Sequence, residues 1–100
     1  MVTERQKTLI QETVSRFDQL KSIDISGKED PYCVISFTTT FAGETAYDLE
    51  LSEASSGYET ILLSSSETPI MRDRIDSINE EQIDSLIDHV IETIRELEGN

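Results

Sequence analysis

Residues 32–51 read YCVISFTTTFAGETAYDLEL, and this stretch decides the fold class. Its first half, residues 32–41, alternates between two faces and is rich in β-branched and aromatic side chains, which suit a pleated and half-buried surface. One face holds Cys33, Ile35, Phe37, Thr39 and Phe41, and the other holds Tyr32, Val34, Ser36, Thr38 and Thr40. We therefore predict a β-strand over residues 32–41.

The second half of the same stretch predicts the returning strand of a hairpin. Ala42-Gly43-Glu44 has the composition of a short hairpin loop. From Thr45 to Leu51 the chain alternates again, with Tyr47, Leu49 and Leu51 on one side and Ala46, Asp48 and Glu50 on the other. A clean alternation of apolar and polar residues indicates a sheet with one face on the core and the other in water.

An amphipathic helix is predicted before this hairpin, over residues 4–21. Thr3 followed three residues later by Gln6 is a capping-box signature. The apolar residues that follow fall on one helical face: Leu9, Ile10, Val14, Phe17 and Leu20. The charged side chains of this segment nearly balance, unlike those of the rest of the chain.

A longer helix is predicted at the C-terminal end. Asn79 is its N-cap, and Gln82 stands at the capping-box position. Ile78 is placed to pack against Ile83 as a hydrophobic staple, and Gly99 is the expected terminator. The apolar stripe consists of Ile83, Leu86, Ile87, Val90, Ile91, Ile94 and Leu97. Its spacing also resembles a coiled-coil seam, so a dimer through this helix is the alternative to packing on the sheet.

The remaining segments carry weaker patterns. Ile23-Asp24-Ile25 alternates briefly, and residues 26–31 read as a turn. Serine-rich residues 52–57 read as a loop, and residues 58–64 read as a third strand whose inward face is left open by the consecutive residues Ile61, Leu62 and Leu63.

Thr68-Pro69 is typical of a helix start, and Met71, Ile75 and Ile78 follow it at helical spacing. The predicted order is an N-terminal helix, a three-stranded antiparallel meander, a possible short helix and a long C-terminal helix, within a single domain over residues 1–100. We therefore expect an α+β fold, a two-layer sandwich in which both helices cover one face of the sheet.

The charge balance restricts the classes of partner. The chain has 21 acidic and 8 basic side chains, which give a formal net charge of −13 at pH 7. Such a chain lacks the clustered cations that bind nucleic-acid phosphates, and an anionic membrane surface would repel it. Apolar runs such as Ile61-Leu62-Leu63 are far too short to span a membrane, and the N-terminus lacks the apolar block of a signal sequence. We expect a cytoplasmic protein that binds neither nucleic acid nor membranes.

The reactive side chains are too few to predict an enzyme. Cys33 is the one cysteine and His89 the one histidine, so no intrachain disulfide and no ordinary zinc site can form. A Cys33–His89 nucleophile pair is conceivable, but the alternation around Cys33 predicts a small core residue. His89 reads as an exposed histidine on the polar side of the last helix. We expect no catalytic activity, metal or cofactor.

The acidic side chains gather on two predicted surfaces. On the last helix they recur one turn apart opposite the apolar stripe, and on the sheet they share the wet face or lie near it. The candidate partner-binding residues are Glu81, Asp84, Asp88 and Glu92 on the helix, and Asp48, Glu50, Glu44 and Glu59 on the sheet and its loops. We hypothesise a small non-enzymatic interaction protein that binds a basic partner such as a nucleic-acid-binding protein or nuclease. It would be an inhibitor or nucleic-acid mimic of the anti-restriction, anti-CRISPR or nuclease-immunity type.

Two alternatives remain open at this stage. A surface with few lysines and many carboxylates also suits a protein that stays soluble in a salt-loaded cytoplasm. The second alternative is an adaptor or a chaperone-like dimer that binds a partner through the exposed face of its sheet. Tyr32, Val34 and either Ile61 or Leu63 would form an apolar patch there. The sequence is compatible with a monomer or a homodimer.

Overall fold

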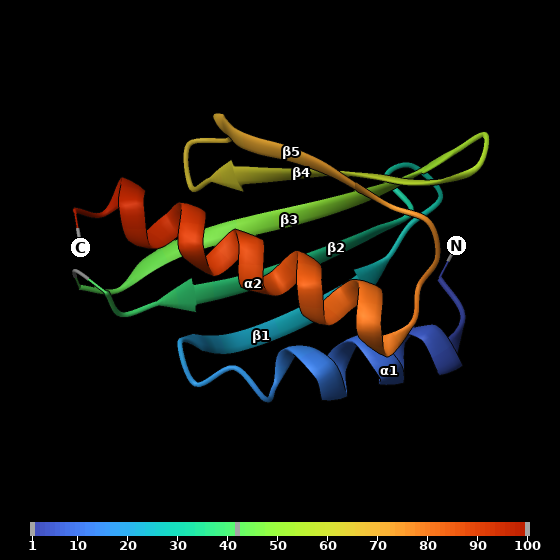
Figure 1. The fold of residues 1–100 in the computed structure, drawn as a ribbon, viewed down its shortest axis with the longest axis horizontal. Helices are drawn as coiled ribbons and strands as arrows, with labels where there is room; N and C mark the ends of the chain where they lie inside the picture. Colours follow the sequence, from blue (N-terminus) through green and yellow to red (C-terminus); the bar gives the residue numbers. More distant parts are fainter. Residues whose placement is uncertain (1, 42, 100) are drawn as a thin grey trace.

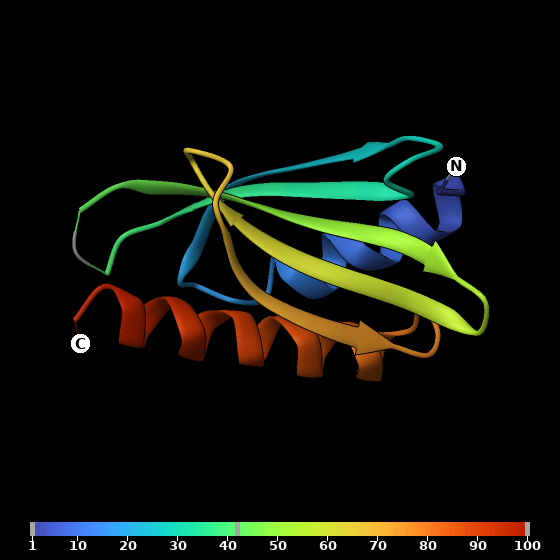
Figure 2. The same cartoon turned by 90° about the horizontal axis from the view of Figure 1, so that it is seen from above.

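The computed structural model describes residues 2–41 and 43–99, which form two helices and a five-stranded antiparallel sheet (Figure 1). The elements follow in the order α1 (Glu4–Val14), β1 (Leu20–Gly27), β2 (Cys33–Thr39), β3 (Thr45–Ala54), β4 (Gly57–Ser64), β5 (Pro69–Ile75) and α2 (Glu80–Leu97). Figure 2 shows both helices on one side of the sheet, so the predicted α+β class is confirmed. The sheet is a meander in which each strand pairs with the next, but it has five strands where the sequence predicts three.

The hairpin of β2 and β3 forms the centre of the core, as predicted. Ile35 pairs with Leu49, and Cys33 pairs with Leu51; all four side chains are fully buried. Phe37 pairs with Tyr47, and their rings stack with centroids 5.9 Å apart. Because residues directly opposite on neighbouring strands share a face, these pairs fix the helix-facing side of the sheet.

The loop of this hairpin is described in part. Of the predicted loop Ala42-Gly43-Glu44, Ala42 lies outside the described residues. β2 ends at Thr39, two residues before the predicted end of the strand. Phe41 and Gly43 form an isolated bridge, and Glu44 is exposed.

The first helix is shorter than the predicted span of residues 4–21. The Thr3–Gln6 capping box is present as predicted, but α1 ends at Val14. Phe17 lies in a turn whose N–H donates to the Val14 carbonyl, and Leu20 begins β1. Both apolar side chains still pack in or against the core. The turn and the start of β1 therefore bury the two residues that the helical spacing assigned to the first helix.

The first strand of the sheet, β1, is longer than the sequence indicates. Residues 23–25 show only a brief alternation, whereas the strand runs from Leu20 to Gly27. The register shifts between Lys21 and Asp24, and Ser22 has a φ of 52°. A bulge of this kind interrupts the period of two by which a strand is recognised in sequence.

The predicted loop over residues 52–57 is wrong, because β3 continues to Ala54 and β4 begins at Gly57. Only Ser55 and Ser56 form the turn, with Ala54 paired to Gly57. Gly57 has a φ of 140°, and a Cβ there would lie 2.6 Å from the carbonyl oxygen of Ile75. The third strand predicted over residues 58–64 is confirmed, with Thr60 and Leu62 buried.

The short helix predicted after Thr68-Pro69 is also wrong, since Pro69–Ile75 form the edge strand β5. Met71 and Ile75 are four residues apart, a spacing that fits one face of a helix and, being even, one face of a strand. Met71 pairs with Leu62 and Ile75 with Tyr58. Proline is tolerated here because it stands at the start of an edge strand.

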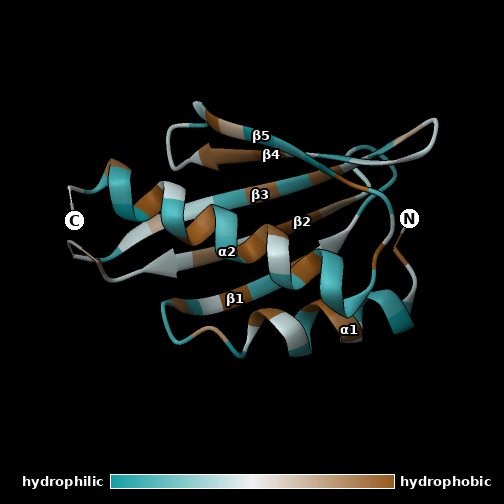
Figure 3. Cartoon of the chain, in the orientation of Figure 1, coloured by the Kyte–Doolittle hydropathy of each residue, from teal (hydrophilic) through white to brown (hydrophobic). Residues whose placement is uncertain are grey.

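Helix α2 agrees with the prediction almost throughout. The Asn79 side chain accepts a hydrogen bond from the Gln82 N–H at 2.9 Å. The Gln82 side chain accepts from the Asp76 N–H rather than completing the capping box. Gly99, at a φ of 84°, follows the helix end as expected. The two colours that alternate along α2 in Figure 3 mark its apolar and polar faces.

The apolar stripe of α2 is used inside the protomer. Ile83, Ile87, Val90 and Ile94 are fully buried, whereas Leu97 near the end of the helix is 58% exposed. The stripe therefore packs on the sheet and is not available as a coiled-coil seam. Within the part of the chain that the structure describes, no helix is long and apolar enough to cross a bilayer.

Candidate interaction surfaces

The fold separates the eight predicted partner-binding carboxylates into three groups. Four lie on α2, three lie on the sheet face away from the helices, and Glu44 lies in the hairpin between β2 and β3. Because α2 and the open sheet face are on opposite sides of the molecule (Figure 2), one flat partner surface cannot contact both. Each must be considered as a separate surface.

The acidic row of α2, which we define as Glu81, Asp84, Asp88 and Glu92, lies on the outer side of the helix. Glu81, Asp88 and Glu92 are exposed and Asp84 is partly exposed. None of the four takes part in an ion pair with another described residue. Their like charges repel one another at this spacing.

The basic residues near the acidic row have other contacts. Arg16 after α1 forms an ion pair with Glu80 at 2.6 Å, and the hydrogen bond from Arg16 lowers the pKa of that carboxyl. The Arg95 guanidinium lies over the ring of Phe41, 5.4 Å from its centre. The hydrogen bond to Glu80 and, more weakly, the nearby Asp84 carboxylate raise the pKa of Arg16, and Arg95 lines the same hollow as Asp88 and Glu92. The row thus has cations nearby but no ion pair of its own.

A hollow of about 370 Å³ lies along this row, between α2 and the segment that follows α1. It is lined by Phe17, Gln19, Asp88, Ile91, Glu92 and Arg95. Apolar and acidic side chains thus meet in one depression, at whose edge Arg95 also lies. A lysine or arginine side chain has the same two parts, an aliphatic stem and a charged end.

The open sheet face has mixed charge rather than an acidic row. Asp48 accepts a hydrogen bond from the Ser36 hydroxyl at 2.7 Å. Glu59 is paired across the strands with Arg74. Glu50 lies opposite Ile61, which in turn lies opposite Arg72. The arginines on this face are not predicted from the sequence, because they belong to β5, which was expected to be a helix.

The apolar patch on this face differs in composition from the predicted one. Tyr32 does not belong to it: its hydroxyl donates to the Gln6 side chain at 2.8 Å, its ring contacts Tyr58, and only 7% of the residue is exposed. Tyr32 precedes the first residue of β2, so the alternation of that strand does not determine its direction. The apolar side chains left on the open face are Val34, Ile61 and Leu63.

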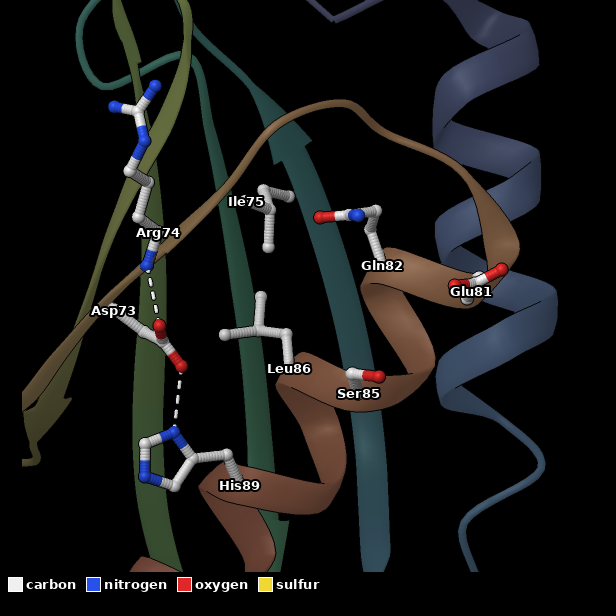
Figure 4. A pocket seen from close by; sticks show the side chains of 8 residues that line it. All are labelled: Asp73, Arg74, Ile75, Glu81, Gln82, Ser85, Leu86 and His89. Carbon is white, nitrogen blue, oxygen red and sulfur yellow. Dashed lines mark hydrogen bonds and ion pairs between the residues drawn. The ribbon is translucent and has the colours of Figure 1, made fainter.

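A groove of about 250 Å³ lies between β5 and α2 and contains the single histidine (Figure 4). His89 Nδ1 lies 2.7 Å from Asp73 Oδ2, and Asp73 Oδ1 accepts the N–H of Arg74 at 2.7 Å. Burial opposes ionisation of Asp73, but the hydrogen bonds from His89 and Arg74 outweigh it and lower the pKa of the carboxyl. This pair is not predicted from the sequence, because the short helix expected after Thr68-Pro69 would not align Asp73 with α2.

Neither Ser85 nor Cys33 forms a reactive pair with His89. Ser85 stands one turn before His89, but in Figure 4 the second ring nitrogen of His89 points away from it. Cys33 is fully buried, and burial raises the pKa of its thiol to about 11, so the core position predicted for it is confirmed. Over residues 2–41 and 43–99, no group of three or more potential metal ligands occurs.

Comparison of the chain with protein-family models, curated protein sequences and solved structures finds no match.

Proposed function

We propose that this protein is a non-enzymatic interaction protein and that the acidic row of α2 binds a basic surface on a partner protein, which it thereby inhibits. The observation that carries the proposal is the unpaired state of Glu81, Asp84, Asp88 and Glu92 among the described residues. The neighbouring carboxylate Glu80, by contrast, forms an ion pair with Arg16 at 2.6 Å.

The row has the shape of a nucleic-acid backbone segment. Its four carboxylates extend over about 16 Å at a rise of ~1.5 Å per residue, on one side of a straight rod. A protein that binds nucleic acid presents clustered lysine and arginine to such a line of negative charge. We therefore propose a nucleic-acid-binding protein or nuclease as the partner, with its basic groove occupied by α2.

The hollow beside the row supports the same class of partner. A lysine or arginine inserted there would place its methylene groups against Phe17 and Ile91 and its charge beside Asp88 and Glu92. Because much of the attraction acts over distance, association should be fast at low salt and slow at high salt.

The experiment compares two variants with the same change in charge. D84K/D88K/E92K reverses the α2 row, and E29K/E53K/E67K reverses three exposed carboxylates in loops and at a strand end. Each protein is immobilised, loaded with host lysate at low salt and eluted with a potassium chloride gradient. We expect the wild type and the loop variant to retain the same basic protein, and the α2 variant to lose it.

The same experiment has two outcomes that oppose the proposal. Equal retention by the α2 variant would place the interface elsewhere. If the wild type retains no basic protein, the row is a solvated surface of the kind that salt adaptation favours. For a retained partner, the association rate measured by surface plasmon resonance should fall steeply with salt for the wild type and less steeply for the α2 variant.

A further inference from the structure

We infer that the open face of the sheet is a self-association surface, on which a second copy of this chain docks sheet to sheet with its strands nearly parallel. The two helices cover the other face of the sheet (Figure 2). The dimer therefore has four layers, in the order helices, sheet, sheet and helices. Packed sheets of this kind keep their strands within about 30° of each other.

On two adjacent transverse rows of the open face, the charge is divided between the two sides of the sheet. One transverse row, read from β1 to β5 through directly paired residues, is Ser26, Val34, Glu50, Ile61 and Arg72. The neighbouring row contains Asp24, Ser36, Asp48 and Leu63. The carboxylates of these two rows thus belong to β1 and β3, whereas the cation belongs to β5. Apolar Ile61 and Leu63 lie between them on β4.

Glu50 and Arg72 are well placed to contact another copy. They are two strands apart, about 10 Å at ~4.8 Å per strand, with Ile61 between them. Neither forms an ion pair with another described residue of its own chain. Beside Arg72, between β4 and β5, is a hollow of about 310 Å³ to which Ile61 and Glu59 also contribute.

This layout is complementary to itself under one type of two-fold rotation. An axis parallel to the strands, between two facing sheets, carries β5 of one copy over the β3 side of the other. With the axis above β4, Ile61 meets Ile61 of the second copy, and each Arg72 lies against Glu50 of the other copy. The two Glu59 side chains also meet at the axis, with the Arg74 of each copy on the neighbouring strand. A two-fold axis across the strands would instead place β5 over β5 and bring arginines together. Charge therefore selects the first arrangement, which is closed and isologous.

The edges of the sheet favour this face-to-face contact over edge-to-edge pairing. β1 carries the bulge near Ser22, and β5 begins with Pro69 and has a register shift opposite Leu62 and Leu63. Bulges and proline are the usual devices that stop a sheet edge from adding strands. With the axis above β4, only β3, β4 and β5 of the two copies overlap, over about 14 Å by about 20 Å on each, so the contact buries roughly 600 Å² in total, the size of a weak and reversible interface.

The dimer does not compete with the proposed function. Its acidic α2 rows point outward from both copies, so a partner could still bind each one. The large net charge opposes association at low salt, but at about 0.15 M salt the screening length is ~8 Å and the far helices contribute little. The contact should therefore be tested at intermediate ionic strength.

The test uses sedimentation equilibrium of the full chain at about 0.15 M salt, from about 10 μM to about 500 μM. We expect a reversible dimer for the wild type. E50R and R72E should each raise the dissociation constant by about tenfold or more, because each places like charges in contact twice. The matched control is E92R, which changes the net charge as E50R does, but on the opposite side of the molecule.

The decisive sample is an equimolar mixture of E50R and R72E. In a mixed dimer the two substituted side chains face each other with opposite charge, and the native Arg72 of the first variant faces the native Glu50 of the second. The mixture should therefore associate as strongly as the wild type. The inference is overturned if the wild type stays monomeric at the highest concentration, if E92R weakens the dimer as much as E50R does, or if the mixture fails to recover association. None of these results depends on whether α2 binds a basic partner.

Discussion

The Tyr47 hydroxyl donates a hydrogen bond to Glu98 Oε2 at 2.6 Å and thereby ties the last residues of the chain to β3. The Thr39 hydroxyl on β2 donates to the same oxygen at 3.0 Å. Tyr47 and Thr39 are almost completely buried. The end of α2 is thus held against the central hairpin by a charged acceptor and two neutral donors, in addition to its apolar stripe.

Replacing Tyr47 by phenylalanine should destabilise the protein without changing its fold. The ring continues to stack on Phe37, but the hydroxyl that donates to a carboxylate is lost. Hydrogen bonds to charged groups contribute roughly 1.5–3 kcal/mol, so Y47F should lose about 2 kcal/mol of unfolding free energy in urea titration. E98Q, which keeps an acceptor, should lose less. Equal stability of Y47F and wild type would show that the bond contributes nothing.

The same contact gives the protein a characteristic loss of stability in alkali. Burial, with the hydrogen bond and charge of Glu98, raises the pKa of Tyr47 well above its ordinary value. In the unfolded chain the phenol ionises near pH 10, so the unfolded state releases its proton first. Unfolding free energy should therefore fall as the pH rises above about 10. The fall should be shallower for Y47F, and parallel curves for the two proteins would contradict this.

Two buried threonines provide a matched test of hydrogen bonding in the sheet. Thr39 donates to Glu98, whereas the hydroxyl of Thr60 has no hydrogen-bond partner among the described residues. Both side chains are almost fully buried. A buried polar group without a partner costs about 1–3 kcal/mol, which valine of the same shape avoids. T60V should raise the unfolding free energy by about 1 kcal/mol, and T39V should lower it. If T60V is destabilising, a buried water or a rotated hydroxyl satisfies Thr60.

The Asp73–His89 pair should make the unfolding free energy depend on pH in the acid range. Its hydrogen bonds lower the pKa of Asp73, so the unfolded chain takes up a proton at higher pH than the folded one does. The stabilisation is present above about pH 4, the ordinary range for aspartate, and is lost as the pH falls below it. In urea titrations from pH 6 to pH 2, D73N should lose less stability than the wild type. D18N, at an exposed loop position, is the control and should follow the wild type.

The elements that can be predicted from the sequence are those whose period is unbroken. The β2–β3 hairpin alternates without interruption, and α2 has a capped start and a continuous stripe, so the predicted bounds of both are nearly correct. β1 is largely missed because its bulge near Ser22 resets the alternation. β5 is mistaken for a helix because Met71 and Ile75 stand at a spacing that both structures share.

The same error determines which parts of the candidate site are missed. The row of carboxylates on α2 follows from helical geometry alone, so the sequence is sufficient to place it. The pairing of Asp73 with His89 and of Glu59 with Arg74 depends on β5 lying beside both α2 and β4. The repeat of apolar residues along one element does not show which other element it contacts. In addition, β5 was predicted with the repeat of a helix and not that of a strand.

Cys33 should be inert in the native protein. It lies on the helix-facing side of β2, is fully buried, and burial raises the pKa of its thiol to about 11. The reactive thiolate is therefore scarce, and a reagent can reach it only when the sheet opens. We expect Ellman's reagent at pH 8 to modify the native protein at least about 100-fold more slowly than the protein unfolded in guanidinium chloride. Stabilising T60V should slow the native reaction further if global unfolding is the route. Rapid modification under native conditions would show that β2 opens locally, and the central hairpin would then not be the most stable part of this fold.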